Sequence, residues 1–330
     1  MIATRREPGT GAPARQPAGL HRYALLVCAS TFVLIFAGGL VTSTGSGLAV
    51  PDWPLSFGQV FPAMEGGVLF EHGHRLVAAS MGLLTIGLYI WAWLGGASKP
   101  VKLLAACALG AVILQGLLGG LTVLMKLPPA VSIAHACLAQ LFLCATVAVA
   151  AVTGAGWDRP GLKAEGGSMP LRALALATTA AVFGQLVLGA VMRHTHAGLA
   201  IPDFPLAFGR ILPPLDTEAV QIHFAHRAWA VVVAGLAVWL SARVFRSHGA
   251  EPRLARPAIA LLVLLAAQIS LGGLTVLTRR AVAPTTLHVL VGAMILAASF
   301  LITLRAHRLS RAGAAASERA AGRRPLAAPA

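Results

Sequence analysis

The chain has 330 residues, of which 57% are apolar and 11% charged, and its mean hydropathy is +0.77. Soluble domains carry about 25% charged residues, so this composition excludes a cytosolic enzyme, a disordered chain and a fibrous repeat. A net charge of +15 would suggest a nucleic-acid partner on a soluble protein. Here the basic residues lie between and outside apolar runs, which indicates membrane topology and no nucleic-acid role.

Eight apolar stretches are long enough to cross a bilayer, for which a helix needs about 20 residues. An all-α integral membrane protein with eight transmembrane helices is therefore predicted. Seven stretches contain no Asp, Glu, Lys or Arg: residues 23–51, 76–98, 103–125, 127–157, 173–192, 257–278 and 281–304. The eighth, about 219–242, is interrupted only by Arg227. All four cysteines lie in these stretches without a Cys-x-x-Cys pair, so neither a disulfide framework nor a zinc site is expected.

Lys and Arg residues are distributed unequally between the two sides of the membrane. The N-terminal tail, the even-numbered loops and the C-terminal tail carry 19 of them, and the opposite side carries 5. The positive-inside rule places both termini in the cytoplasm and the odd-numbered loops outside the cell membrane. The basic tails are residues 1–22 and 305–330, and we expect 1–20 and 308–330 to be disordered.

The two halves of the chain repeat one another. Residues 47–58 match residues 198–209 at 9 of 12 positions, and residues 115–124 match residues 268–277 at 8 of 10. Four helices per repeat give both repeats the same orientation. The sequence thus predicts two tandem, pseudo-symmetric four-helix bundles, residues 23–153 and 172–304, joined by a cytoplasmic linker, residues 154–171.

Each odd-numbered helix ends in a pair of small residues: Gly38-Gly39, Gly119-Gly120, Gly189-Ala190 and Gly272-Gly273. Small residues let membrane helices pack closely, and they also leave room for a flat cofactor. Both interpretations stay open, and the location of the pairs toward the outer ends favours the cofactor.

Four histidines begin the even-numbered helices at matched depth: His74, His135, His226 and His288. The duplication pairs His74 with His226 and His135 with His288. One histidine on an apolar helix is usually a packing residue, but two per bundle favour ligands, since ionisable groups in a bilayer are costly and face the bundle interior. Imidazole is a good axial ligand for haem iron, whereas zinc would need three or four close ligands and copper would usually bring thiolates.

Glu71 lies three residues before His74 and shares its helix face. The second half has His223 at that position, so only the first bundle carries a carboxylate there. An N-terminal helix charge is the alternative interpretation of Glu71. Arg75 and Arg227 could pair with haem propionates or could extend toward the interface.

Four other histidines receive no ligand role. We do not expect His72 to be axial, because its counterpart is Phe224. His194 and His196 are expected to be solvated in an outer loop, and His223 is left without an assigned role. The outer segments that begin at Pro51 and Pro202 are interpreted as lids over each cofactor or as ordinary interfacial loops.

The ordered set of these features resembles the haem A synthase family over about residues 23–304. The resemblance rests on the eight helices in two bundles and on these motifs: the two Gly-Leu-Ala-x-Pro-Asp-x-Pro-Leu-x-Phe-Gly loops, Glu71-x-x-His74-Arg75, His135, His226-Arg227 and His288. It implies oxidation of the C8 methyl group of haem O to a formyl group, through hydroxylated intermediates, for cytochrome oxidase biogenesis. Some branches of the family carry a cysteine pair in the first outer loop, but residues 42–70 contain no Cys.

The same resemblance implies a division of labour between the bundles. The substrate haem would lie between His74 and His135, with Arg75 beside it and Glu71 as the essential catalytic glutamate. A haem b cofactor would lie between His226 and His288, with Arg227 beside it. The implied partners are haem O, the lipid bilayer and, as candidates, haem O synthase, cytochrome oxidase assembly factors and a second copy of the chain.

Two other functions remain open from the residues alone. A dihaem b-type cytochrome, such as a quinol-oxidising subunit, explains four histidines but not the replacement of a histidine by Glu71. A transporter would be consistent with tandem repeats but not with histidines matched at the outer ends.

Overall fold

The computed structural model describes residues 16–17, 19–157 and 169–321 of the chain. In this part of the chain all eight α-helices are long and apolar enough to cross a membrane, which confirms the predicted fold class. They are α1 (Leu20–Ser43), α2 (Gly66–Leu94), α3 (Lys99–Leu124), α4 (Pro129–Thr153), α5 (Leu171–His194), α6 (Glu218–His248), α7 (Pro252–Leu277) and α8 (Val282–Ala321). A short 3-10 helix, Ala197–Leu199, follows α5.

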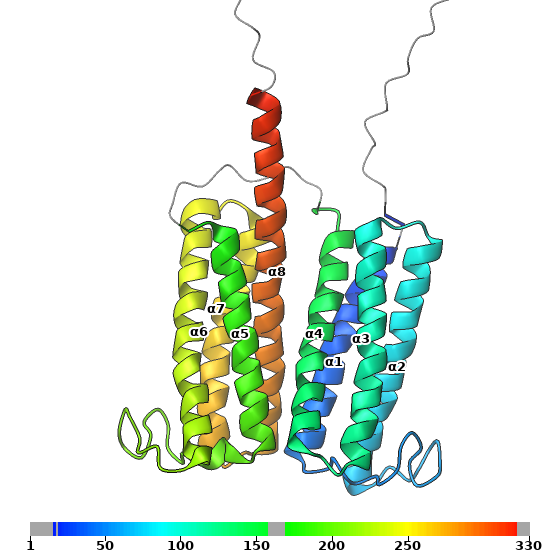
Figure 1. The fold of residues 1–330 in the computed structure, drawn as a ribbon, viewed down its shortest axis with the longest axis vertical. Helices are drawn as coiled ribbons and strands as arrows, with labels where there is room; N and C mark the ends of the chain where they lie inside the picture. The colour runs from blue at the N-terminus through cyan, green and yellow to red at the C-terminus, as the bar shows by residue number, and fades with distance from the viewer. Residues whose placement is uncertain (1–15, 18, 158–168, 322–330) are drawn as a thin grey trace, which may run out of the picture.

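The helices form two bundles side by side, α1–α4 and α5–α8 (Figure 1). Helices α1 and α4 of the first bundle pack against α8, and α4 also packs against α5. An apolar cluster that includes Ile35, Leu143 and Ala293 lies at this boundary. Large apolar side chains such as Leu83 and Val231 are more than 70% exposed on the outside of the bundles, as expected of a surface in contact with lipid.

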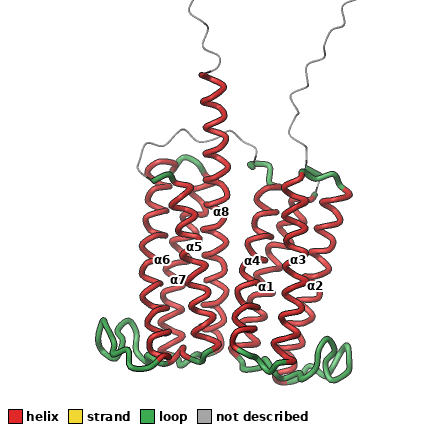
Figure 2. The backbone as a smooth tube through the Cα atoms, in the orientation of Figure 1, coloured by secondary structure: helices red, strands yellow, loops and turns green. Residues whose placement is uncertain are grey.

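The longest loops lie at one end of the molecule and extend sideways from each bundle (Figure 2). They are residues 44–65 in the first bundle and residues 195–217 in the second, which contains the short 3-10 helix. All four even-numbered helices start at this end and therefore run in the same direction. Their first turns and the two loops together form the end of the molecule that the charge distribution predicts to lie outside, which we name the outer face.

Two odd-numbered helices end in the same way in both halves. Lys126 and Leu127 follow α3 with positive φ, and Arg279 and Arg280 follow α7 with positive φ. The N–H of Leu127 donates to the carbonyl of Thr122, and the N–H of Arg280 donates to that of Thr275, each at 2.7 Å. This satisfies a helix-terminal carbonyl and starts α4 and α8 after a short turn.

The helix boundaries differ most from the apolar stretches in three places. Helix α1 ends at Ser43, although the apolar stretch reaches residue 51, and α2 begins at Gly66, ten residues before its charge-free stretch. The expected disorder of residues 308–330 is wrong for 308–321, where α8 continues in an alanine-rich sequence of high helix propensity. The expected disorder of residues 1–15, like much of the linker (158–168) and the end of the tail (322–330), lies outside the described residues.

We expect cysteines at Gln59 and Lys99 to react from opposite sides of the membrane, in a background without the four native cysteines. Both side chains are exposed, Gln59 in the outer loop and Lys99 at the start of α3. A membrane-impermeant maleimide added to intact cells should label the Gln59→Cys variant at once and the Lys99→Cys variant only after the membrane is opened. The reverse pattern would overturn the orientation.

Candidate functional site

The structure brings the four histidines together in two pairs. His74 on α2 and His135 on α4 interact electrostatically within the first bundle. His226 on α6 and His288 on α8 do so within the second bundle. Because the even-numbered helices run in parallel, each pair lies at one depth, near the outer face.

Each of these imidazole rings packs against a glycine of a neighbouring odd-numbered helix. A Cβ atom built on Gly38 or Gly119 would lie 3.1 or 3.2 Å from Cε1 of the histidine that faces it, His74 or His135. In the second bundle, Gly189 faces His226 at 3.2 Å and Gly272 faces His288 at 3.1 Å. The first residue of each small pair therefore makes room for an imidazole.

The second glycine of two of these pairs receives an aromatic ring from an outer loop. Trp53 lies over Gly120, and Phe204 lies over Gly273, with the nearest ring atoms 2.7 and 2.8 Å from a built Cβ. Each loop thus reaches back to the third helix of its own bundle, one residue from the glycine that faces a histidine. This position supports the interpretation of the loops as lids.

Glutamine side chains contact three of the four histidines. Gln115 donates to the carbonyl oxygen of His135 at 3.0 Å, and Gln185 donates to that of His226 at 2.9 Å. Gln268 lies 3.4 Å from Nε2 of His288. These three contacts were missed from the sequence, although Gln115 and Gln268 begin the repeated block and so gave a signal.

Several buried imidazole nitrogens have no hydrogen-bond partner: Nδ1 of His74, of His135 and of His288. Within the described residues no group of three or more His, Cys, Asp and Glu side chains could hold a metal ion. Both ring nitrogens of His226 lie 3.2 and 3.3 Å from Nε2 of Gln185. Imidazoles in pairs, three of them with an uncommitted nitrogen, fit an iron with two axial ligands, as in a haem, better than a zinc site. The described residues therefore fit one haem in each bundle.

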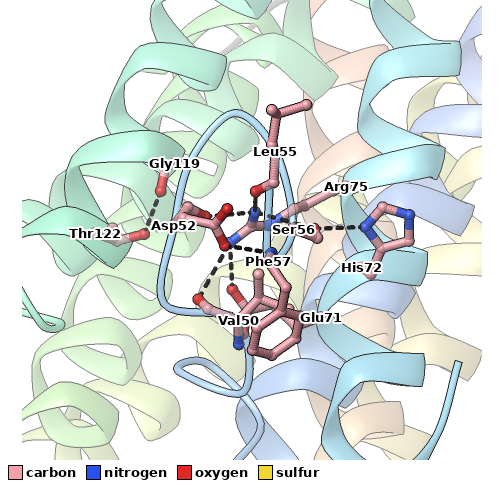
Figure 3. A network of polar contacts seen from close by, with 10 residues as sticks. All are labelled: Val50, Asp52, Leu55, Ser56, Phe57, Glu71, His72, Arg75, Gly119 and Thr122. Atoms are coloured by element: carbon pink, nitrogen blue, oxygen red, sulfur yellow. Dashed lines mark hydrogen bonds and ion pairs between the residues drawn. The ribbon is translucent and has the colours of Figure 1, made fainter. Parts of the chain in front are cut away.

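Glu71 is buried at the base of the first outer loop, with 4% of its surface exposed (Figure 3). Its Oε2 accepts a hydrogen bond of 2.8 Å from the N–H of Val50, and its Oε1 lies 2.7 Å from Nη2 of Arg75. Because α2 begins at Gly66, Glu71 is not in the first turn. The alternative interpretation as an N-terminal helix charge is therefore wrong.

The side chain of Arg75 extends from α2 into the first outer loop. Its Nη1 donates to the carbonyl oxygens of Asp52 and Leu55, at 2.8 and 2.9 Å. Together with the contact to Glu71, these bonds fix the loop to α2 (Figure 3). The described contacts of Arg75 thus serve the loop, while a haem contact of this residue stays a prediction.

The second bundle repeats this arrangement with an imidazole in place of the carboxylate. Nδ1 of His223 lies 3.2 Å from the N–H of Ile201, and Nε2 lies 3.2 Å from Nε of Arg227. Arg227 also donates to the carbonyls of Asp203 and Leu206. A neutral imidazole accepts at one nitrogen only, so His223 satisfies one of these two donors at a time, whereas Glu71 satisfies both.

The remaining outer histidines lie outside the two pairs. His72 is buried, with Nδ1 at 2.8 Å from Oγ of Ser56, so its side chain belongs to the loop contact. His196 is exposed, as expected for a solvated residue. His194 differs from that expectation, because it ends α5, is half-buried and interacts electrostatically with His135.

An aspartate closes each outer loop onto itself. Asp52 accepts hydrogen bonds from the N–H groups of Phe57 and Gly58, at 2.7 and 2.8 Å. Asp203 makes the equivalent bonds in the second loop. The bonds from Gly58 and Phe57 hold the pKa of Asp52 below its ordinary value of 3.8, because they stabilise the ionised carboxylate.

We expect Asp52→Asn to speed hydrogen–deuterium exchange several-fold in peptides that cover residues 52–60. The amide offers one acceptor oxygen in place of two, so Phe57 or Gly58 loses its partner. In the unchanged protein, protection should persist down to pH 3.8 and be lost as the pH falls further through the lowered pKa of Asp52. The loop around Asp203 is an internal control, and equal change in both loops would contradict the assignment.

Comparison with known proteins agrees with this geometry. The COX15-CtaA family profile, described as "Cytochrome oxidase assembly protein", matches residues 21–66 and 64–300. A protein named heme A synthase from Symbiobacterium thermophilum is 34% identical over 257 residues, which are 74% of this chain and 83% of the relative. Proteins of the same name from Geobacillus kaustophilus and Shouchella clausii are 30% and 29% identical, over 89% and 80% of this chain and 93% and 88% of the relatives.

The matches cover both bundles and all four histidines of the two pairs, and they confirm the resemblance predicted from the motifs. The chain belongs to the COX15-CtaA family of cytochrome oxidase assembly proteins.

Proposed function

We propose that this protein is a haem A synthase, a membrane oxidoreductase that converts the C8 methyl group of haem O into the formyl group of haem A. The named relatives support this activity. The observation that carries it in the structure is the difference between Glu71 and His223. Two bundles that share a histidine pair carry different buried groups one helical turn before the first histidine, so they are suited to different tasks.

The first bundle is proposed to take haem O between His74 and His135, and the second to hold haem b between His226 and His288. The contacts of the histidines support this assignment. Gln185 touches His226, but the equivalent position in the first bundle is Leu34, so His74 has no glutamine beside it. A less constrained ligand suits a substrate that must enter and leave.

Haem b, when bound, supplies reversible one-electron chemistry to the site. The residues of the first bundle are proposed to position the substrate and to accept a proton during its oxidation. His74 and His135 would hold the substrate haem, and Gly38 and Gly119 make room for their imidazoles. The loop residue Trp53 covers the outer end of α3 and limits the access of water.

Glu71 is proposed to take up a proton as the methyl group is oxidised. Its carboxylate is buried, and Arg75 and the N–H of Val50 hold it in one orientation. A positioned carboxylate can act as a general base, whereas the imidazole of His223 lies beside the resident haem. Arg75 and Arg227 are proposed to contribute to the haem sites indirectly. Each holds the outer loop of its own bundle in place beside the proposed site.

The protein is a multi-pass membrane protein, and we place both termini in the cytoplasm and the haem sites toward the outer side. Haem O synthase, cytochrome oxidase assembly factors and a second copy of the chain remain candidate partners. A dihaem electron-transfer cytochrome is the alternative function. Pigment extraction separates the two: haem b with haem O or haem A supports the synthase, and haem b alone supports the cytochrome.

Replacement of either proposed axial ligand of haem b should remove that haem. We expect His226→Ala and His288→Ala to lose most of the low-spin haem b spectrum of the purified protein, because one imidazole–iron bond is absent. The exposed His196 gives a matched control, since His196→Ala removes an outer imidazole without touching the pair. Full haem b content in both ligand variants would show that other residues bind the iron.

Glu71→Gln should stop the oxidation without removing either haem. Gln keeps an oxygen that can accept the N–H of Val50, and Arg75 keeps its loop carbonyls, so the fold should persist. Haem O or a partly oxidised form should accumulate among the extracted haems, and haem A should disappear. The mirror change, His223→Gln, alters the equivalent loop contact in the other bundle and should reduce haem A far less.

Haem A at the normal level in the Glu71→Gln protein would refute the catalytic role. Glu71 would then serve only to hold the loop through Val50 and Arg75. Equal loss of haem A in both variants would point to loop structure rather than proton transfer.

A further inference from the structure

Arg193 is a basic residue near the outer end of α5, in a position that the duplication does not repeat. It follows Gly189 by four residues, and Gly189 follows Gln185 by four, so the three share one face of the helix. Gly189 and Gln185 both contact His226. Arg193 therefore lies one turn beyond the His226 contact, toward the outer face.

The guanidinium group of Arg193 lies at the boundary between the bundles. Its Nη2 donates to the carbonyl oxygen of Gly39 at 3.3 Å and to Oγ of Ser43 at 2.9 Å, both on α1. Its Nε is buried and has no hydrogen-bond partner. One donor of this cation is thus buried and uncommitted.

No carboxylate forms an ion pair with Arg193 within the described part of the chain, where Glu71–Arg75 and Glu251–Arg253 are the ion pairs. The charged neighbour that acts on it is also basic, Arg280, and His288 of the second pair lies close enough to be affected by the charge of Arg193. A partly buried cation without a counter-ion is costly in a membrane protein and marks a functional site. An anion beside Arg193 would satisfy Nε and would reduce the repulsion from Arg280.

A haem carries two carboxylates, its propionates, and these need cationic or donor partners. The other two arginines close to the histidine pairs, Arg75 and Arg227, direct their donors to loop carbonyls. Arg193 has the charge, the unused donor and the location. We propose that Arg193 binds a propionate of the haem held by His226 and His288, an assignment that rests on the proposed function.

The first bundle has no arginine at the position equivalent to Arg193. Thr42 occupies the position equivalent to Arg193, and its hydroxyl donates to the carbonyl of Gly38 on its own helix at 3.0 Å. That bundle has no cation at this place to anchor a propionate. The difference agrees with a resident haem in the second bundle and an exchangeable one in the first.

The test uses the purified full-length protein with its haem b and compares Arg193→Gln with Arg210→Gln. Arg210 is an exposed cation of the same outer face, so its variant controls for net charge. Removal of a positive charge beside the haem disfavours the reduced state. We expect about a tenfold change in the ferric–ferrous equilibrium of the Arg193→Gln protein, a fall in midpoint potential of about 59 mV. The Arg210→Gln protein should not shift.

A second measurement identifies the propionate itself. Each protein is reloaded with iron protoporphyrin IX or with its dimethyl ester, and the rate of haem transfer to apomyoglobin is measured. The unchanged protein and Arg210→Gln should lose the ester several-fold faster than the free acid, and Arg193→Gln should lose both at one rate. The Arg193→Lys variant keeps the positive charge and controls for a folding defect in Arg193→Gln. It should still lose the free acid more slowly than the ester, by a smaller factor than the unchanged protein.

Three outcomes oppose the proposal in different ways. If Arg193→Gln keeps both the potential and the preference for the free acid, Arg193 does not bind a propionate of this haem. If only the retention of haem O changes, the contact belongs to the first bundle and the assignment is wrong. If the unchanged protein holds no haem b, the proposed function fails as well.

Discussion

The outer face depends on how two loops are held against a membrane-embedded bundle. A loop folded onto helix ends withdraws carbonyl oxygens from water, and each of them needs a donor. Arg75 supplies these donors in the first bundle and Arg227 in the second. The same side chains fix Glu71 and His223, so the loop fold and the polar groups of each site have one common support.

Duplication gave both bundles the same scaffold, and the chemical differences lie in a few positions on it. The glycine–histidine contacts and the aspartate-closed loops occur twice with nearly equal distances. Glu71 against His223, Leu34 against Gln185 and Thr42 against Arg193 break the repeat. Each of these positions lies on the helix that carries a paired histidine or on the helix whose glycine faces one, so the differences fall close to the two pairs.

The sequence was enough to predict the eight helices and the family, because apolar length, positive charge and repeated motifs are local signals. It also predicted the pairing of His74 with His135 and of His226 with His288, since imidazoles inside apolar helices are rare; their role as ligands stays a prediction. The residues that contact these histidines could not be predicted from the sequence, because such contacts depend on which helices pack against each other. Gln185 has no repeat counterpart to draw attention to it. The start of α2 at Gly66 was missed because buried contacts, not hydropathy, keep Glu71 and Arg75 in the helix.

One contact between the bundles has a consequence for the timing of the reaction. A Cβ built on Gly39 would lie 3.3 Å from Cγ2 of Thr286, so α1 and α8 approach almost to backbone contact. Gly39 adjoins the glycine that faces His74, and Thr286 lies two residues before His288. Under the proposed function, this contact would hold the histidine pair of one bundle at a fixed distance from that of the other. Electron tunnelling weakens steeply with distance, so each transfer would start from the same path length, whatever the outer loops do.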